Sequence, residues 1–349
     1  MPDALFERIA SLSNVLLAAR VAARGKRYRR SAAGFLLRME QFCLRLSEAL
    51  ADGSWQPSPY RVFAITDPKL RTICAAPFAD RVVHQALVQV VEPRFERGFI
   101  YDSYSCRVGK GTHAALLRVA AWAREYPWAL KVDVQKYFPS IDHEVVMVLL
   151  RRKVACARTL DLFARVLGSW ASREAPLRWF DGDDPSAPPA RARGLPIGNL
   201  TSQFLSNVVL DAVDHRVKDG LGVRAYARYC DDMVVFGRSP GELAAVRAEI
   251  YAALRRLRLV AHPHKTQVVP TAQGVPWVGF VVYPQRIGMR REALRRLRRR
   301  LRGGGGSGGD GERWRAVVAS LRGHARYGIS TGRLAAWFGV GGAGVGAEA

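Results

Sequence analysis

Two adjacent aspartates, Asp231 and Asp232, have the clearest potential for chemistry in this chain. The segments on either side, 223–228 and 233–236, are rich in β-branched and aromatic residues, which predicts two short strands. Because successive side chains on a strand point to opposite faces, the two carboxylates converge only if the chain turns between the strands. The pattern predicts a hairpin with carboxylates at its tip, although Asp is also an ordinary residue of solvated turns.

A third aspartate favours a chemical role for this pair. Asp133 lies near the end of a largely apolar strand predicted over 129–134, where a buried carboxylate needs a cation or hydrogen bonds. One carboxylate from a strand and two from a hairpin form the oxygen ligand set that Mg²⁺ prefers, and substrate phosphates complete the shell. The three aspartates therefore predict a site for metal-assisted phosphoryl transfer.

Three other patterns lack a feature that their chemistry requires. Gly-Asp-Asp at 182–184 resembles the catalytic signature of viral RNA polymerases, but no strands flank it, so a loop is predicted. Gly-Lys-Gly-Thr at 109–112 lacks the G-x-x-x-x-G-K-[ST] arrangement, which argues against a nucleotide hydrolase. His262 and His264 have no third ligand near them in the sequence, which disfavours a metal site there.

Composition points to a polyanionic partner. The 349 residues include 54 Lys and Arg against 30 Asp and Glu, a net charge of +24, and 49% are hydrophobic. Such an excess favours nucleic acid over a membrane surface, because no apolar run approaches membrane-spanning length and no signal peptide pattern is present. Five scattered cysteines without a C-x-x-C pair predict a reducing, cytoplasmic location.

Hydrophobic periodicity and the positions of Gly and Pro predict the remaining elements. Helices are expected over 3–24, 33–51, 80–93, 114–125, 205–212, 242–259, 289–302 and about 314–321, with Pro93 ending the third. Strands are expected over 62–65 and 72–75, as a hairpin with cations near its tip, and over 277–283.

The order of several motifs resembles the reverse transcriptases. These are Asp133 followed by Phe138, Ser202 before a helix, Tyr-Cys-Asp-Asp at 229–232, Lys265, and Trp-Val-Gly-Phe at 277–280. More narrowly, four segments resemble the reverse transcriptases of diversity-generating retroelements: Phe-Ile-Tyr-Asp-Ser-Tyr at 99–104, Gly-Lys-Gly-Thr-His-Ala-Ala at 109–115, Phe-Pro-Ser-Ile-Asp-His at 138–143 and Leu-Pro-Ile-Gly-Asn-Leu-Thr-Ser-Gln at 195–203.

The narrower resemblance depends mainly on the loop 195–203. Retroviral, group II intron and retron enzymes typically read Gln-Gly and end Ser-Pro here, whereas this chain has Ile197 before Gly198 and Gln203 after Ser202. Ile cannot make the hydrogen bonds of a Gln amide beside the incoming nucleotide, which should weaken discrimination between base pairs. In the resembled family this loop accompanies error-prone copying of template adenines.

The resemblance implies an α+β fold of the right-hand polymerase type, with fingers, a palm that has an antiparallel sheet, and a helical thumb. The expected boundaries are an amino-terminal helical basic extension at 1–60, fingers and palm at 61–285, a basic helical thumb at 286–338 with a Gly-rich linker at 303–311, and a disordered tail at 339–349.

The resemblance also assigns roles to individual residues. Two Mg²⁺ ions, for which Mn²⁺ is a possible substitute, would be held by Asp133, Asp231, Asp232 and the Val134 carbonyl, with Lys265 as a candidate general acid. The nucleotide would contact Lys69, Arg71, Phe138, Ile197, Gly198 and Gln203, with Phe138 excluding a 2′ hydroxyl. Primer and template would contact Tyr229, Gly279, Arg295, Arg298 and Arg299.

These residues predict an RNA-directed DNA polymerase that copies a template RNA into cDNA from dNTPs. Expected partners are the template RNA, the RNA–cDNA hybrid and a small basic helical accessory protein. Two alternatives stay open: a retron or abortive-infection type reverse transcriptase in phage defence, and a non-catalytic RNA-binding protein on a polymerase fold. Ile197 and Gln203 argue against the first, and the retained aspartates and Lys265 argue against the second.

Overall fold

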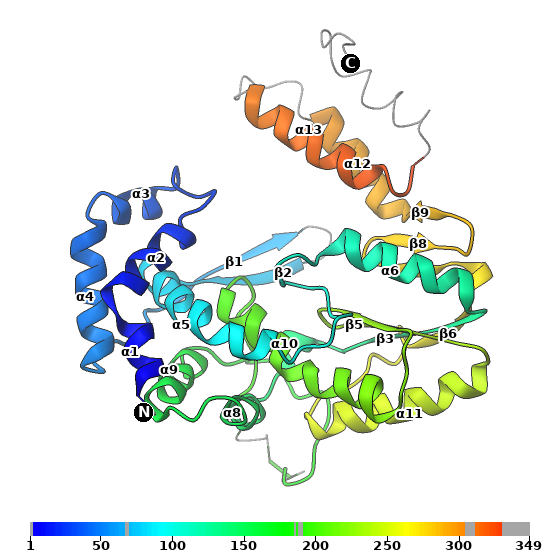
Figure 1. Ribbon diagram of the computed structural model, residues 1–349, viewed down its shortest axis with the longest axis horizontal. Helices are drawn as coiled ribbons and strands as arrows, with labels where there is room; N and C mark the ends of the chain where they lie inside the picture. Colours follow the sequence, from blue (N-terminus) through cyan, green and yellow to red (C-terminus); the bar gives the residue numbers. More distant parts are fainter. Residues whose placement is uncertain (1–2, 67–69, 185, 188–190, 304–310, 330–349) are drawn as a thin grey trace. The chain divides into compact units, whose positions relative to one another are not determined.

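The computed structural model describes residues 3–66, 70–184, 186–187, 191–303 and 311–329 (Figure 1). The chain divides into two compact units. The first contains residues 1–101, 133–222 and 248–263, and the second contains residues 102–132, 223–247 and 264–349.

The amino-terminal part of the first unit is helical. Its elements are α1 (Ala4–Ala10), α2 (Leu12–Ala22), α3 (Arg30–Leu36) and α4 (Met39–Ala51), drawn in blue in Figure 1. The single helix predicted over 3–24 is wrong, because Ser11 has an extended backbone and its side chain accepts a hydrogen bond from the Asn14 N–H. A serine cap starts a new helix in this way. The helix predicted over 33–51 is likewise divided into α3 and α4.

Helix α5 (Phe78–Glu96) continues past the proline that was predicted to end it. Pro93 lies inside the last turn, where it removes one backbone donor. Phe95, which is 2% exposed, packs edge-on against Phe204 of α10 (Leu200–His215) with 5.3 Å between ring centroids. Burying a side chain of this size contributes about 1.5–3 kcal/mol, which offsets the lost hydrogen bond.

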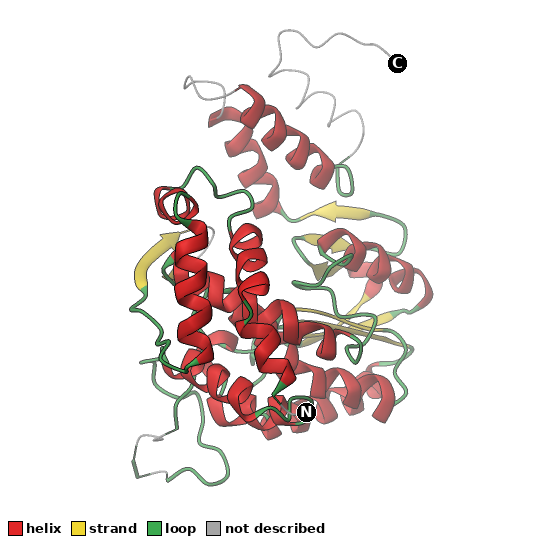
Figure 2. Cartoon of the chain, turned by 60° about the vertical axis from the view of Figure 1, so that its left-hand side comes forward, coloured by secondary structure: helices red, strands yellow, loops and turns green. Residues whose placement is uncertain are grey.

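The predicted hairpin of the first unit is confirmed. β1 (Arg61–Thr66) and β2 (Leu70–Ala75) pair antiparallel, with Val62 opposite Cys74. Lys69, expected at its tip, lies outside the described residues. Four further helices are α7 (Tyr137–Ser140), α8 (His143–Arg151), α9 (Ala157–Gly168) and the π-helix η1 (Arg216–Gly220). Figure 2 shows the whole chain coloured by secondary structure, with helices in red, strands in yellow and loops in green.

A four-stranded sheet organises the second unit. Its strand order is β4-β5-β3-β6, from β3 (Trp128–Asp133), β4 (Tyr226–Tyr229), β5 (Asp232–Gly237) and β6 (Gln267–Pro270). Helix α6 (Thr112–Glu125) packs Leu116 and Val119 into a core with Val234 and Phe236 of β5. Helix α11 (Pro240–Arg256) follows β5. Within this sheet β3 is the neighbour of β5, the strand that begins at Asp232.

The segment 277–283, predicted as one strand, forms a hairpin instead. β7 (Val275–Trp277) and β8 (Phe280–Val282) are antiparallel and joined by Val278 and Gly279, whose φ values are 40° and 91°. Positive φ at both central residues is what a two-residue hairpin turn of the primed type requires. The remaining elements are the short 3₁₀ turn η2 (Thr271–Gln273), β9 (Ile287–Met289), α12 (Arg291–Gly303) and α13 (Gly311–Ala325).

The mixed helix and sheet composition expected from the sequence is confirmed. Residues 304–310, most of the predicted linker, and the predicted tail from 339 lie outside the described residues. Among the described helices, none combines the length and the apolar character needed to cross a membrane.

A buried histidine predicts how stability depends on pH. His84 on α5 is 1% exposed, and neither ring nitrogen has a hydrogen-bond partner among the described residues. Burial and then the Arg81 guanidinium lower the pKa of His84 to about 4. The unfolded chain takes up a proton at His84 near pH 6.5, whereas the folded chain takes it up only near pH 4. The contribution of the neutral His84 to the free energy of unfolding is therefore complete above pH 6.5 and is lost as pH falls toward 4.

His84→Leu should therefore remove up to about 3 kcal/mol of the acid-induced loss of stability between pH 6.5 and 4. Urea unfolding at several pH values measures the effect. If the free energy of unfolding changed equally with pH in the variant and in the wild type, the pH dependence could not be assigned to His84.

Candidate active site

The carboxylate hairpin predicted from the sequence is present. Tyr229 of β4 pairs with Asp232 of β5, so Cys230 and Asp231 form a two-residue turn. Cys230 has φ 58°, in the left-handed region that non-glycine residues seldom occupy outside functional or strained sites. Both carboxylates are half-buried. The turn thus places two negative charges side by side at the end of the sheet.

A buried arginine supports the turn from within the second unit. Arg228 is fully buried on β4, and its Nη1 donates to the Cys230 carbonyl at 3.1 Å. Its backbone N–H donates to the Asp102 carbonyl at 2.9 Å, which ties β4 to the segment before α6. Burial, and secondly the Asp231 charge, raise the pKa of the Cys230 thiol well above its usual range, so this side chain stays neutral beside the carboxylates.

Lys131 is a site residue that the sequence analysis missed. Its ammonium forms an ion pair with the Asp232 carboxylate, and the two side chains are 11% and 24% exposed. Lys131 precedes Asp133 by two positions on β3, so the two residues share one face of the strand. That spacing is the signal by which it could have been found.

Asp133 ends β3, as predicted. Its carbonyl accepts a hydrogen bond from the His262 N–H at 2.7 Å, and Val134 forms an antiparallel bridge with Ala261. Gln135 donates to the Val260 carbonyl at 2.8 Å. Because the flanking peptide groups make these bonds, the Val134 carbonyl points away from Ala261.

The donor chemistry of the aspartates fits a divalent cation. Carboxylate and carbonyl oxygens are the ligands that Mg²⁺ prefers, and an ammonium already stands at Asp232 where a cation would bind. Within the described part of the chain, no group of three or more His, Cys, Asp and Glu side chains is placed to hold a metal ion. The ligand set therefore stays a prediction.

Several residues predicted to contact the nucleotide lie together in the first unit. The Ile197 carbonyl accepts a hydrogen bond from the Cys74 N–H of β2 at 3.1 Å, and the Leu195 N–H donates to the Phe138 carbonyl at 2.8 Å. The Ser202 hydroxyl donates to the Pro196 carbonyl at 2.7 Å, which closes the loop onto α10. The loop 195–203 is thereby fixed between β2 and Phe138.

The Gly-Asp-Asp loop is occupied by structural ion pairs, in agreement with the sequence prediction. Arg191 contacts both Asp183 and the fully buried Asp142 at 2.7 Å. The hydrogen bond from Arg191 is the main cause that lowers the pKa of Asp183 to about 2. Asp142 also caps α8 by accepting from the Glu144 and Val145 N–H groups. These contacts hold Asp183 and Arg191 against Asp142 at the start of α8.

The other predicted residues are mostly accessible. Tyr229 contacts Thr112 through its hydroxyl at 3.2 Å, and Gly279 occupies the turn between β7 and β8. On α12 Leu297 is buried, as expected for a docked apolar stripe. The residues predicted to contact nucleotide, primer or template, or to act as general acid, that have exposed side chains are Arg71, Gln203, Lys265, Arg295, Arg298 and Arg299.

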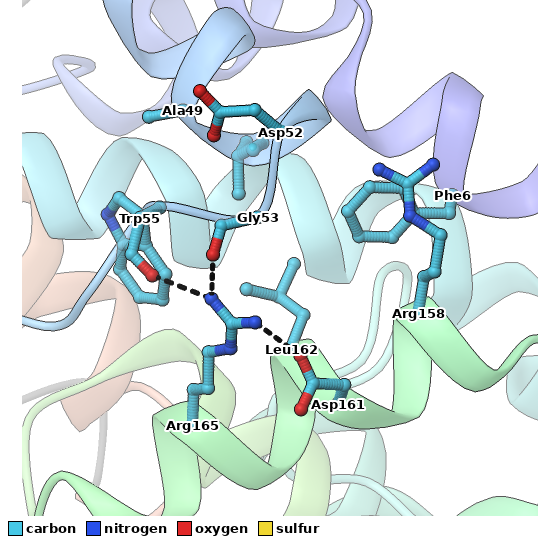
Figure 3. A pocket seen from close by; sticks show the side chains of 10 residues that line it. Phe6, Ala49, Asp52, Gly53, Trp55, Arg158, Asp161, Leu162 and Arg165 are labelled. Carbon is cyan, nitrogen blue, oxygen red and sulfur yellow. Dashed lines mark hydrogen bonds and ion pairs between the residues drawn. The ribbon is translucent and has the colours of Figure 1, made fainter.

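A cavity of about 140 Å³ in the first unit has a structural explanation (Figure 3). Arg165 donates to the carbonyls of Gly53 and Trp55 and pairs with Asp161 at 2.7 Å. Arg158 lies over the Phe6 ring, 4.2 Å from its centroid. Both guanidinium groups are engaged by the protein itself. The cavity therefore marks where α9 is fastened to the amino-terminal helices.

Comparison with solved structures defines the class of fold. The chain is similar to telomerase from Candida albicans, solved with a fragment of telomeric RNA, with a TM-score of 0.51. The sequences are 10% identical, and the match covers 82% of this chain and 55% of that one. This likeness places the chain among proteins with the telomerase and reverse transcriptase polymerase fold.

Residues 66–282 match the sequence family described as reverse transcriptase (RNA-dependent DNA polymerase). This match covers more than half of the chain, so the chain belongs to the reverse transcriptase family. The predicted class of enzyme, an RNA-directed DNA polymerase, is confirmed at the level of the family.

Two curated relatives agree with this family. Protein YkfC of Escherichia coli (strain K12) is 25% identical over 274 residues, which cover 67% of this chain and 69% of that protein. The group II intron-encoded protein LtrA of Lactococcus lactis subsp. cremoris is 22% identical over 183 residues, covering 50% of this chain. The matched region spans only 28% of LtrA.

The geometry of the loop generates a prediction at Gly198. Its φ is 114°, and a Cβ atom there would lie 3.2 Å from Cγ2 of Ile73. Gly198→Ala should cost about 1–3 kcal/mol, because the substitution adds backbone strain to a close contact with β2. The midpoint of urea unfolding measures the loss.

Gly168→Ala is the matched control. Gly168 lies at the end of α9, and a Cβ there meets no atom within 4 Å. Equal stability of the two variants would show that the loop does not depend on the glycine.

Proposed function

We propose that this protein copies a template RNA into cDNA, with frequent errors opposite template adenines, and serves targeted gene diversification. The observation that carries the proposal is the setting of Ile197. Its carbonyl bonds to β2 while its side chain is partly exposed, at the position where related enzymes place a hydrogen-bonding Gln. An apolar side chain here removes a positioning contact and thus lowers discrimination between base pairs.

The metal ligands in this proposal are Asp133, Asp231, Asp232 and the Val134 carbonyl. Two bound Mg²⁺ ions would lower the pKa of the primer hydroxyl and neutralise the triphosphate, with Mn²⁺ as a substitute. The protein's own contribution would be to present Asp133 and Val134 at the end of β3, and Asp231 and Asp232 at the turn into β5. Lys265, exposed before β6, would protonate the leaving pyrophosphate.

The nucleotide contacts follow from the loop and the β1–β2 hairpin. Arg71 on β2, together with Lys69, would bind the triphosphate through charge-assisted hydrogen bonds. Phe138, next to the loop 195–203, would pack against the sugar and exclude a 2′ hydroxyl. Gly198 and Gln203 would complete the pocket. These roles together select deoxynucleotides with loose base discrimination.

A right-hand organisation agrees with the distribution of charge. The fingers and palm would comprise 61–285, and the thumb 286–338, preceded by the helical extension 1–60. Arg295, Arg298 and Arg299 on α12 would contact phosphates without reading sequence, which suits an enzyme that moves along its template. Tyr229 and Gly279 would contact the primer.

The net charge of +24 supports RNA as a partner, and so does the likeness to a telomerase solved with RNA. A small basic helical accessory protein would assist the enzyme. The group II intron-encoded relatives favour a second candidate, faithful copying of an intron-type template.

Replacing Asp231 or Asp232 with Asn should reduce Mg²⁺-dependent primer extension at least about 10³-fold, because the neutral amide is a poor ligand for a hard cation. Binding of single-stranded RNA should stay within about twofold, since phosphate contacts lie elsewhere. Asp184→Asn, in the Gly-Asp-Asp loop, is the control and should extend normally. Robust synthesis by Asp231→Asn would refute the site.

Ile197→Gln should lower misincorporation opposite template adenine by about tenfold, because the amide restores a contact worth about 1.4 kcal/mol in the transition state. Sequencing of cDNA from a defined RNA template gives the errors for each template base. Ile197→Leu keeps the apolar character and should leave the error spectrum unchanged. A wild-type enzyme that copies adenine faithfully would instead favour the intron-type candidate.

A further inference from the structure

Among the described residues, both charge contacts of the Lys131 ammonium lie within the second unit. Lys131 is on β3, its carboxylate partner Asp232 begins β5, and the Trp277 ring of β7 lies 5.6 Å from its ammonium. Lys131 is only 11% exposed in its side chain. A charged group that is removed from water needs such partners, because burial without them is strongly unfavourable.

The two contacts of the ammonium differ in kind. The contact with Asp232 is a charge pair, and that carboxylate is also one of the proposed metal ligands. The contact with Trp277 is a cation–π interaction with a ring whose orientation is fixed, because its indole N–H donates to the Ala115 carbonyl at 3.2 Å. Trp277 itself is 1% exposed. Lys131 therefore keeps a partner if the carboxylate is withdrawn.

We propose that Lys131 is a resident counter-cation of Asp232, which occupies the carboxylate in the metal-free enzyme and is displaced toward Trp277 when a divalent ion binds. The inference rests on the proposed function, since it takes Asp232 as a metal ligand. Two cations at one carboxylate repel each other, so the ammonium and the divalent ion compete. Lys131 thus neutralises the Asp232 carboxylate between catalytic cycles and weakens the affinity of this carboxylate for a metal ion in the absence of nucleotide.

This competition also involves the β7–β8 hairpin. Trp277 is the last residue of β7, directly before the Val278-Gly279 turn that is proposed to contact the primer. When Lys131 leaves Asp232, its remaining contact is with this hairpin. The displaced ammonium therefore lies against the residue that precedes this turn.

The test is binding of Mn²⁺ to the full chain without nucleic acid or nucleotide, followed by the electron paramagnetic resonance signal of free Mn²⁺. Lys131→Met keeps the length of the side chain and its contact with Trp277 but removes the charge. It should bind Mn²⁺ about tenfold more tightly than the wild type, as expected when a like charge is removed from a ligand. Lys131→Arg, which keeps the charge, should bind like the wild type.

Lys153→Met is the matched control. Lys153 lies over the Phe95 ring at 5.3 Å and has no carboxylate partner among the described residues, so its replacement changes the net charge equally. It should leave Mn²⁺ affinity unchanged. Lys131→Gln is a second neutral variant and should also bind Mn²⁺ more tightly, whether or not Lys131→Met folds.

The outcomes separate this inference from the proposed function. Equal Mn²⁺ affinity in the wild type and both neutral Lys131 variants, with binding abolished by Asp232→Asn, would overturn the role of Lys131 and leave the metal site intact. Binding that is insensitive to Asp232→Asn in every background would instead refute the metal site. Tighter binding by Lys153→Met as well would show a general effect of charge and would also overturn the inference.

Discussion

The turn between β4 and β5 is the constraint on which the proposed chemistry depends. Two adjacent aspartates can act at one point only because Cys230 adopts a left-handed conformation and the chain reverses within two residues. Such a backbone persists when its surroundings enforce it. Arg228 does so from the buried side by donating to the Cys230 carbonyl, and Lys131 neutralises Asp232. A backbone strain, a buried guanidinium and an ion pair together set the position of the carboxylates.

The first unit meets a different requirement, which is to hold an irregular loop in one shape. The loop 195–203 is fixed by backbone hydrogen bonds to β2 and to Phe138, and by burial of side chains such as Leu195 and Asn199. Asp142 and Arg191 hold the neighbouring segment through buried charge pairs, which position a loop firmly because an unpaired partner would be costly. Specificity in the proposed reaction thus depends on backbone geometry as much as on Ile197.

Much of the fold could be predicted from local patterns. The strands that flank the aspartates, the β1–β2 hairpin and the helix near Ser202 follow from residue types and their periodicity, although α10 begins at Leu200 and so contains Ser202 instead of following it. The errors occur where a local signal competes with packing. Helix α5 continues through Pro93 because Phe95 is buried against Phe204. The strand predicted over 277–283 folds into a hairpin because Gly279 and even Val278 adopt positive φ.

The sequence by itself determined the family of this protein, the hairpin that carries Asp231 and Asp232, and the unusual residue at 197. Those features depend on residue type and order along the chain. Only the tertiary structure decided which groups surround them. Lys131 and Asp232 are 101 positions apart, and Ile197 and Cys74 are separated by a similar distance in sequence. Periodicity within a strand or helix carries no information on such pairs, because they form only when the sheet and the loops are assembled.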